Sequence, residues 1–265
     1  HNVSSAASDV YKRQVHGFST PSFVWGGLLE NLTSQGYKVL VYDHYGRGYS
    51  ERPKTSYNKD LYVDSLKELM DSQDIAQPVH LVGYSMGGPI VGHFAVSYPD
   101  LSKSLTLIAP AGFMIEASGL TGWTTKPLFG DWFWHVFNHR IYGVGRMSET
   151  VGSDDPLSIN EEEFLANFNN QLLYKGFTES LLSTVRNFNL FNAEEMYSRI
   201  GSMKIPTLAI WGKLDGVVPY DGSLLLKKSI PQVTLETIDE GTHDITYRQP
   251  TQVGEAMKTF LLTIE

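Results

Sequence analysis

The feature that most constrains the fold is a short apolar run that ends in a glycine-rich turn. Residues 79–82 read V-H-L-V, and G-Y-S-M-G-G follows directly from Gly83 to Gly88. Glycines two positions before and after Ser85 let a strand and a helix pass closely at a tight turn. Pro89 then opens a predicted helix, where a first-turn proline loses no helical hydrogen bond. The pattern predicts a strand, a sharp turn that exposes Ser85, and a helix.

A serine held at such a turn is suited to nucleophilic attack. The N-terminus of the following helix aims free N–H groups and its positive dipole end at the developing oxyanion. A glycine-rich turn with an idle serine is the alternative, because 24 glycines make a chance match to G-x-S-x-G easier. The nucleophile hypothesis therefore requires a base and an acid elsewhere in the chain.

Strands and helices alternate along much of the chain. Apolar runs predict strands at 37–42, 79–82, 105–109, 206–211 and 233–238. Helical spacing or helix-forming composition predicts helices at 23–35, 58–73, 222–229 and 251–264. This alternation predicts an α/β fold with a mostly parallel sheet and helices on both faces. The length of 265 residues suits one domain with an insertion.

The alternation breaks between residues 111 and 202. This part is rich in aromatic and loop-forming residues, with helical stretches at 160–174 and 178–188. We interpret 111–202 as a helical lid inserted into a core made of 15–110 and 203–265. Its aromatic side chains are candidates either for the wall of an apolar pocket or for the lid's own core: Phe113, Trp123, Phe129, Trp132, Phe133 and Phe137.

The loops after the later strands offer partners for Ser85. Catalytic groups in a parallel α/β sheet lie on loops at the carboxyl ends of the strands. Asp215 is the carboxylate in the loop after 206–211, and His243 is the histidine in the loop after 233–238. Asp239 and Asp244 are rival acids, but they adjoin His243 in sequence, which makes it hard for either to orient the far ring nitrogen.

Five motifs in this order resemble the α/β-hydrolase superfamily over about residues 15–265. They are His16-Gly17, the loop Asp43–Ser50, the turn Gly83–Gly88, Trp211–Asp215 and Gly241–His243. The resemblance implies a serine–aspartate–histidine triad in that chain order. It also implies an oxyanion hole made by the backbone N–H groups of Phe18 and Met86, and a lid over an acyl pocket. A member of this superfamily needs no metal or organic cofactor for this chemistry.

We expect a serine esterase with a lipase-like preference, acting through an acyl-enzyme. Phe18, Trp25 and Met86 are candidates for the catalytic floor, and an apolar pocket suits an ester with an apolar acyl or alcohol part. Three alternatives stay open. A carbon–carbon bond hydrolase of ring-cleavage dienoates would use Arg140, Arg146 or Arg186 of the lid. A proline iminopeptidase would use Glu161 to Glu163, and a non-catalytic receptor for a small apolar ligand could keep the triad.

The totals exclude several other classes. A net charge of −8 makes nucleic acid and anionic membrane surfaces unsuitable partners. The absence of cysteine excludes disulfides and thiol catalysis. No run approaches the ~20 apolar residues of a membrane span. We expect a cytoplasmic protein that acts on a small-molecule ester.

The first fourteen residues are unlike the rest of the chain. Residues 9–14 read D-V-Y-K-R-Q, which resembles a sequencing adapter read in frame. We interpret residues 1–14 as a non-native tail, with an ordinary disordered terminus as the alternative. The resemblance implies two or three strands before His16-Gly17, and we expect these strands to be missing or replaced here.

A strand leading into His16 should be apolar, because parallel sheets are covered on both faces. The chain instead offers Lys12, Arg13 and Gln14. Burying two unpaired cations would cost several kcal/mol each. We therefore expect residues 1–8 outside the core, at most a strained strand near 10–15, and a chain of low stability.

Overall fold

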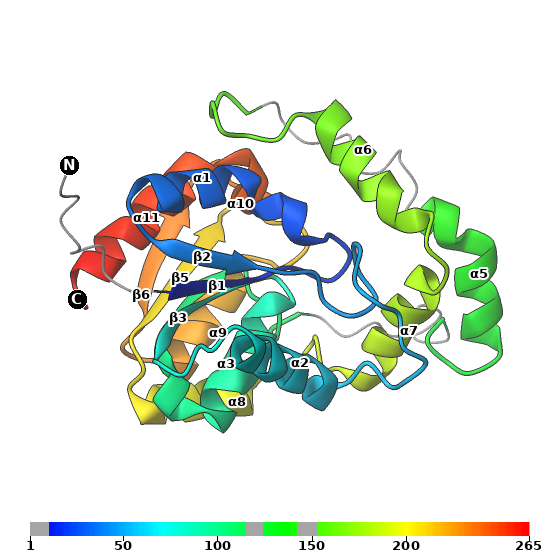
Figure 1. Cartoon of the computed structure of the whole chain (residues 1–265), viewed down its shortest axis with the longest axis horizontal. Coiled ribbons are helices and arrows are strands. Elements are labelled where there is room, and N and C mark those ends of the chain that lie inside the picture. Colours follow the sequence, from blue (N-terminus) through cyan, green and yellow to red (C-terminus); the bar gives the residue numbers. More distant parts are fainter. Residues whose placement is uncertain (1–10, 115–123, 142–152, 265) are drawn as a thin grey trace.

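A single parallel sheet forms the centre of the molecule (Figure 1). The structure, a computed structural model, describes residues 11–114, 124–141 and 153–264. In the described residues the strand order is β2-β1-β3-β4-β5-β6, and every pairing is parallel. The strands are β1 (Tyr11–Val15), β2 (Lys38–Val41), β3 (Val79–Tyr84), β4 (Ser102–Ile108), β5 (Thr207–Gly212) and β6 (Thr234–Ile238). The predicted α/β architecture is confirmed.

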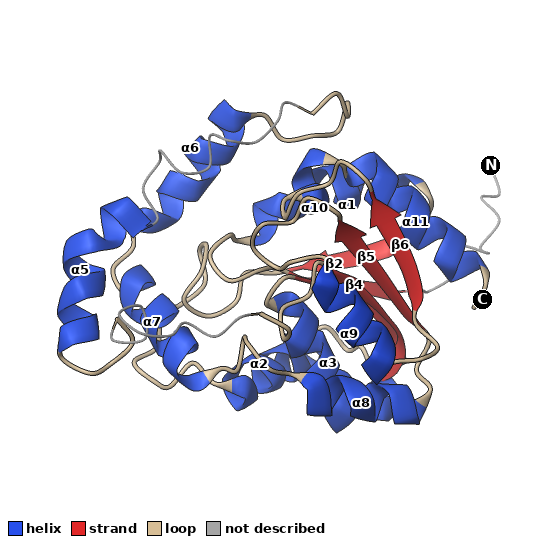
Figure 2. Ribbon diagram, turned by 180° about the vertical axis from the view of Figure 1, so that it is seen from behind, coloured by secondary structure: helices blue, strands red, loops and turns tan. Residues whose placement is uncertain are grey.

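Helices cover both faces of this sheet (Figure 2). On one face lie α1 (Gly26–Ser34), α10 (Ile245–Arg248) and α11 (Pro250–Leu262). On the other lie α2 (Lys59–Ser72), α3 (Gly87–Ser97), α8 (Glu194–Met203) and α9 (Asp221–Ser229). Short 3₁₀ turns stand at Ser22–Trp25 and Pro99–Leu101. No helix in the described part of the chain is long and apolar enough to cross a membrane.

Strand burial follows strand position. Every residue of β3 and β5 is buried, which explains their continuous apolar runs, because helices cover both faces of a parallel sheet. The edge strand β6 alternates between exposed and half-buried side chains over its first four residues, whereas β2 is exposed at Lys38 and half-buried from Val39 to Val41. The loops that the sequence singled out follow the carboxyl ends of both central and edge strands, at β1, β2, β3, β5 and β6.

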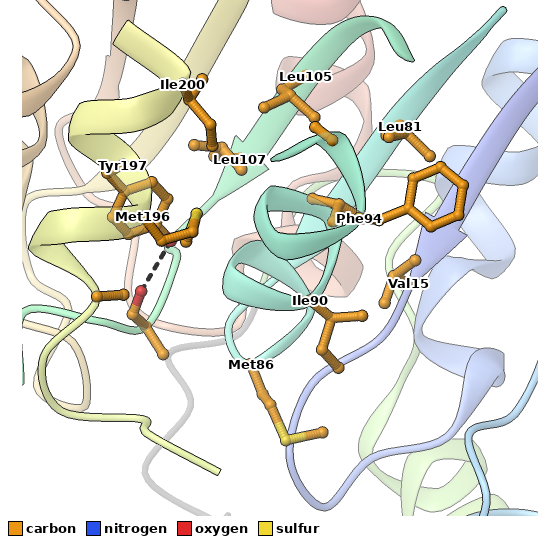
Figure 3. Packing of buried hydrophobic residues seen from close by; sticks show 14 of the residues in the cluster. Val15, Leu81, Met86, Ile90, Phe94, Leu105, Leu107, Met196, Tyr197 and Ile200 are labelled. Atoms are coloured by element: carbon orange, nitrogen blue, oxygen red, sulfur yellow. Dashed lines mark hydrogen bonds between the residues drawn. The ribbon is translucent and has the colours of Figure 1, made fainter. Parts of the chain in front are cut away.

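Helix α3 carries the packing beneath the Ser85 turn (Figure 3). Its Ile90 and Phe94 are fully buried in one apolar cluster with Leu105 and Leu107 of β4. Tyr197 of α8 joins the same cluster and donates its hydroxyl proton to the carbonyl oxygen of Ala111 at 2.9 Å. The turn therefore rests on a rigid platform of helix and sheet.

Three helices lie beyond the ends of the strands and outside the two covering layers (Figures 1 and 2). They are α5 (Phe129–Ile141), α6 (Glu161–Leu172) and α7 (Phe177–Asn187), all between β4 and β5 in the chain. Of these, α7 contacts the covering layer below through a hydrogen bond between its Thr184 and Tyr62 of α2. Helix α8 also begins inside the predicted insertion 111–202, but it packs beside α3 through Met196 and Ile200. The division of the chain at residues 110 and 203, and a lid function for α5 to α7, stay predictions.

Strand β1 begins inside the segment that we set apart as a tail. It pairs with β2 on one side and β3 on the other, so residues 11–14 lie within the sheet. Gln14 is fully buried, and neither atom of its side-chain amide has a hydrogen-bond partner in the described structure. The burial of a polar side chain at this position matches the concern raised by the sequence; the non-native origin of the segment stays a prediction.

Candidate active site

Ser85 stands at the end of β3 in a backbone conformation that few non-glycine residues adopt. Its φ is 53°, in the left-handed region. The backbone around it is held by three hydrogen bonds. The Ser85 N–H donates to the carbonyl of Ile108 at 2.9 Å, and its own carbonyl accepts from Gly88 at 2.9 Å and Ala111 at 3.0 Å. The surroundings thus over-determine a strained turn, as is common at functional sites.

The glycines of this turn are required by close approach. A Cβ on Gly87 would lie 2.0 Å from the carbonyl oxygen of Val15, at the end of β1. A Cβ on Gly17 would lie 3.3 Å from the Cβ of Ser85. The loop after β1 therefore lies directly against the serine, as the pairing of β1 with β3 dictates.

Ser85, His243 and Asp215 form a hydrogen-bonded chain. His243 Nε2 lies 3.0 Å from Ser85 Oγ, and His243 Nδ1 lies 2.8 Å from Asp215 Oδ2. The three side chains come from the loops after β3, β6 and β5, at the carboxyl edge of the sheet. The structure thus brings together the three residues that the sequence selected, in the geometry of a nucleophile, a base and an orienting acid.

The carboxylate of Asp215 is fixed by its own loop. Its Oδ1 accepts hydrogen bonds from the backbone N–H groups of Val217 and Val218, each at 2.8 Å. The rival acids have other partners. Asp239 pairs with Lys213 at 2.6 Å on the surface, and Asp244 accepts a hydrogen bond from Thr242 and lies 3.6 Å from the Arg248 guanidinium.

Tyr84 holds the loop that carries His243, a contact that the sequence analysis missed. Its hydroxyl donates to the carbonyl oxygen of His243 at 3.0 Å, and the two rings lie 5.3 Å apart. Burial raises the pKa of Tyr84 well above its usual value, so its hydroxyl remains a donor. Its position immediately before the serine was the available signal, but its partner lies 159 residues away.

The backbone N–H groups of Phe18 and Met86 are the candidate oxyanion donors. Neither donates a hydrogen bond to any described residue. Met86 directly precedes α3, so its N–H belongs to the end of the helix where donors are left free. Gly17, adjacent to Phe18, lies against Ser85, which brings this loop to the nucleophile.

A pair of buried histidines braces the loop after β1. His16 Nε2 accepts the backbone N–H of His44 at 2.9 Å, and His44 Nε2 lies 3.3 Å from the carbonyl oxygen of His16. Burial lowers the pKa of His16 to about 4, and burial also lowers that of His44 well below its usual value. Both rings are therefore neutral at pH 7, and their hydrogen bonds hold the loops after β1 and β2 together.

Asp43 secures the start of the neighbouring loop. Burial raises its pKa, but the charge interaction with His16 and the hydrogen bonds from Ser22 and Tyr49 outweigh that effect and leave the pKa below its usual value. Its two oxygens accept the backbone N–H groups of Ser22 at 2.7 Å and Tyr49 at 3.0 Å. The Asp43–Ser50 motif is thus a scaffold for the loop after β1.

The predicted pocket aromatics do not gather in one place. Trp25 is fully buried and packs edge-on against Tyr84 at 6.2 Å. Phe113 stacks on Tyr197 at 5.4 Å, beside α8. Along α5, Phe133 and Phe137 are half-buried and lie 4.9 Å apart, whereas 47% of Phe129 and 56% of Trp132 are exposed. Trp123 lies outside the described residues.

Comparison with known proteins decides the family. The sequence model of the alpha/beta hydrolase fold matches residues 15–248. The chain belongs to this family. It is 29% identical to Lipase 3 of Moraxella sp. (strain TA144), with 86% of this chain and 70% of that protein covered. It is 24% identical to the human monoacylglycerol lipase ABHD6, with 94% and 74% covered.

Solved structures agree on the fold of this alpha/beta hydrolase. The bromoperoxidase of Bacillus anthracis superposes with a TM-score of 0.77 at 23% identity, covering 96% of this chain and 92% of that one. The family predicted from five short motifs is therefore confirmed, and the family and its lipase relatives support hydrolysis of esters in general.

Proposed function

We propose that this alpha/beta hydrolase is a serine esterase that cleaves carboxylic esters with an apolar acyl or alcohol part through an acyl-enzyme. The proposal rests on the hydrogen-bonded chain from Ser85 Oγ through His243 to Asp215. It needs no cofactor, because the nucleophile, base, acid and oxyanion donors all come from the chain.

The first half of the reaction forms the acyl-enzyme. His243 Nε2 takes the proton of Ser85 Oγ as that oxygen bonds to the ester carbonyl carbon. The carbonyl oxygen becomes an oxyanion and accepts hydrogen bonds from the N–H groups of Phe18 and Met86. Asp215 holds the imidazole in the required tautomer and stabilises its charged form. His243 then gives the proton to the leaving alcohol oxygen as the carbon–oxygen bond breaks.

The second half releases the acid. Water attacks the acyl carbon on Ser85 while His243 Nε2 takes a proton from it, and a second oxyanion forms in the same place. As this intermediate collapses, the bond from the carbon to Ser85 Oγ breaks and His243 returns the proton to that oxygen. The carboxylic acid leaves, and the triad is restored.

An apolar ester is the substrate class that the relatives and the segment 111–202 favour together. The lipase names belong to proteins 24–29% identical to this chain. Phe129 and Trp132 on α5 offer exposed apolar surface. Helices α5 to α7 lie on the side of the sheet where the strands end (Figure 1), and we propose that they cover the site as a lid.

The arginine that a dienoate hydrolase would use is already engaged. Arg186 donates to Asp131 at 2.8 Å and to the carbonyl oxygens of Thr125 at 2.6 Å and Lys126 at 3.0 Å. The side chain of Arg140 and the whole of Arg146 lie outside what the structure describes. The described contacts therefore do not favour a carboxylate-binding role for Arg186.

The carboxylates that an iminopeptidase would use have a structural explanation. Glu161 to Glu163 are exposed in the first turn of α6, where negative charge complements the helix dipole. Asn160 caps the same turn by accepting the Glu163 N–H at 2.9 Å. We therefore favour an esterase over a proline iminopeptidase.

A panel of p-nitrophenyl esters of rising acyl length tests the proposal. We expect turnover of the panel, no turnover of a ring-cleavage dienoate or a prolyl amide, and loss of activity in a folded Ser85→Ala variant. Triad losses in serine hydrolases reach about 10⁶ in kcat. Turnover of the dienoate alone, or of the prolyl amide alone, would refute the esterase and favour the corresponding alternative enzyme. Binding of apolar esters without any turnover would favour the non-catalytic receptor.

A further inference from the structure

A buried arginine connects the loop of the candidate oxyanion hole to a helix of the segment 111–202. Arg47 follows β2 in the loop Asp43–Ser50 and is fully buried. Its Nε donates to the carbonyl oxygen of Phe18, and its guanidinium lies 5.4 Å from the centre of the Phe18 ring. Its Nη1 donates to Ser180 Oγ at 2.8 Å and its Nη2 to Thr184 Oγ1 at 3.1 Å, both on α7.

The two hydroxyl groups on α7 are oriented to accept from this guanidinium. Thr184 Oγ1 donates its proton to the carbonyl oxygen of Ser180 at 2.8 Å, and the Tyr62 hydroxyl lies 2.7 Å from Thr184 Oγ1. Ser180 Oγ lies within donating distance of the carbonyls of Phe177 at 2.7 Å and Gly46 at 3.0 Å. With their protons committed, both oxygens present lone pairs to Arg47.

The contact with Phe18 acts on the atom next to the chemistry. The Phe18 N–H is the candidate oxyanion donor, and the Phe18 carbonyl, one peptide further along, is the group that Arg47 holds. On the other side, His16 is held through its bonds with His44. Because the segment is fixed on both sides of Phe18, the direction of its N–H is set, and a planar fork such as guanidinium sets it more strictly than an ammonium would.

We propose that Arg47 is a positioning residue that aims the Phe18 N–H at the oxyanion, and that Ser180 and Thr184 of α7 hold Arg47 in place. The inference rests on the proposed serine esterase function and extends it. It makes α7 part of the catalytic apparatus without any contact between α7 and the ester, since the helix acts through Arg47 on the loop after β1.

A residue that positions an oxyanion donor affects the energy of the transition state and not the binding of the substrate. An interaction realised only in the oxyanion lowers kcat when it is lost and leaves KM nearly unchanged. Loss of a whole oxyanion donor costs about 10²–10³ in kcat, so a misdirected donor should cost about 10–10². Arg47→Lys keeps the charge but loses the fork, which makes it the primary variant.

Arg52→Lys is the matched control, in the same connection between β2 and α2. Arg52 donates to the carbonyls of Ser50 and Gly48, each at 2.8 Å, and approaches that of Gln171 at 3.5 Å, but does not bond to Phe18. On α7, Ser180→Ala and Thr184→Val remove the anchors. Ser183→Ala is their control, because the Ser183 hydroxyl accepts from the Tyr57 N–H at 3.1 Å and is not bonded to Arg47.

The experiment measures kcat and KM on a p-nitrophenyl ester and the affinity for an alkyl trifluoromethyl ketone. The ketone carbon bonds to Ser85 Oγ, the serine proton passes to His243, and the resulting oxyanion occupies the hole. We expect Arg47→Lys to lower kcat and ketone affinity by the same ~10–10² with KM within about twofold. Ser180→Ala with Thr184→Val should show a smaller loss of the same kind, one that adds little to Arg47→Lys.

Two results would overturn the inference. One is a folded Arg47→Lys enzyme with wild-type kcat and ketone affinity, and the other is an equal loss in Arg52→Lys or Ser183→Ala. If Arg47→Lys does not fold, the Ser180 and Thr184 variants decide in the same way. A wild-type protein that neither turns over the esters nor binds the ketone would instead refute the serine esterase, so the two failures are distinct.

Discussion

The choice of Asp215 as the acid, over Asp239 and Asp244 near His243, can be tested at the level of single residues. Only Asp215 among these three acids is hydrogen-bonded to His243 in the described structure, at 2.8 Å from Nδ1. Asp215→Asn should therefore lower kcat by about 10⁴, because an amide cannot hold the imidazole in the required tautomer. Asp239→Asn and Asp244→Asn should keep most of the activity on a p-nitrophenyl ester. A larger loss from either neighbour would show that the acid is misassigned.

Tyr84 provides a second test at this scale. Tyr84→Phe keeps the ring against His243 and removes the hydroxyl bond to its carbonyl, a bond of a kind worth about 1 kcal/mol. We expect kcat to fall about fivefold with KM unchanged. Tyr220→Phe, which removes a hydroxyl contact to Thr237 at 3.0 Å, is the control and should leave kcat intact. Equal kcat in wild type and Tyr84→Phe would refute a role in placing the histidine.

Some residues of the candidate site are marked by the local sequence pattern, whereas others depend on partners that are distant in the sequence. The proximity of Ser85, Asp215 and His243 was predictable, because each follows a predicted strand and a parallel sheet gathers those ends on one edge. Tyr84 and Arg47 were not, because their partners lie 159 residues away for Tyr84 and 133 and 137 away on α7 for Arg47. Composition and spacing carry no record of such contacts.

Strand β1 offers a prediction at the scale of one element. Gln14 is fully buried and both polar atoms of its amide are without partners in the described structure. Gln14→Met keeps the length of the side chain and removes those atoms, so the free energy of unfolding in urea should rise by about 1–3 kcal/mol. The stabilising direction is unusual for a substitution in a central strand.

Gln171 is the matched control for this substitution. It is equally buried, but its amide accepts the Gly48 N–H at 3.2 Å and donates to the Ser19 carbonyl at 2.9 Å. Gln171→Met should therefore lower the free energy of unfolding. If Gln14→Met destabilises the protein as much as Gln171→Met does, the Gln14 amide must be satisfied and our account of β1 is wrong.

Elements were predictable where the apolar pattern is strong. The later strands were placed within a few residues, because β3, β4 and β5 are buried runs. β1 was not expected as a well-paired strand, since Lys12, Arg13 and Gln14 lack the apolar pattern, yet pairing with β2 and β3 places them in the sheet. Aromatic residues on α5 suggested a pocket from composition alone, and the exposure of Trp132 shows why composition cannot assign a direction to a side chain.

The whole molecule should lose stability in mild acid because of its buried histidines. Burial lowers the pKa of His16 in the folded protein to about 4 from the ordinary 6.5. Above pH 6.5 neither the folded nor the unfolded state is protonated there, so the free energy of unfolding is unaffected. Between pH 6.5 and 4 the unfolded chain binds a proton that the folded protein refuses, and stability falls by on the order of 3 kcal/mol.

His44 should add to this loss, since burial also lowers its pKa. Urea unfolding at pH 8, 6 and 5 measures the effect, and His135→Gln is the control, because His135 is exposed on α5. The fall in stability that His16 and His44 cause should persist in that variant. A free energy of unfolding that does not change from pH 8 to pH 5 would contradict neutral, buried histidines beside the active site.

The central claim is that Ser85 is the nucleophile of this alpha/beta hydrolase. An alkyl fluorophosphonate tests it most directly, because the serine oxygen displaces fluoride and forms a stable phosphonyl ester only where a base activates it. Mass spectrometry of the intact protein and of its peptides should show one adduct, on Ser85, with loss of esterase activity in proportion. Ser85→Ala should take up none, and His243→Ala should react far more slowly. Full loss of activity with the adduct on another residue, or esterase activity that survives complete labelling of Ser85, would contradict the account.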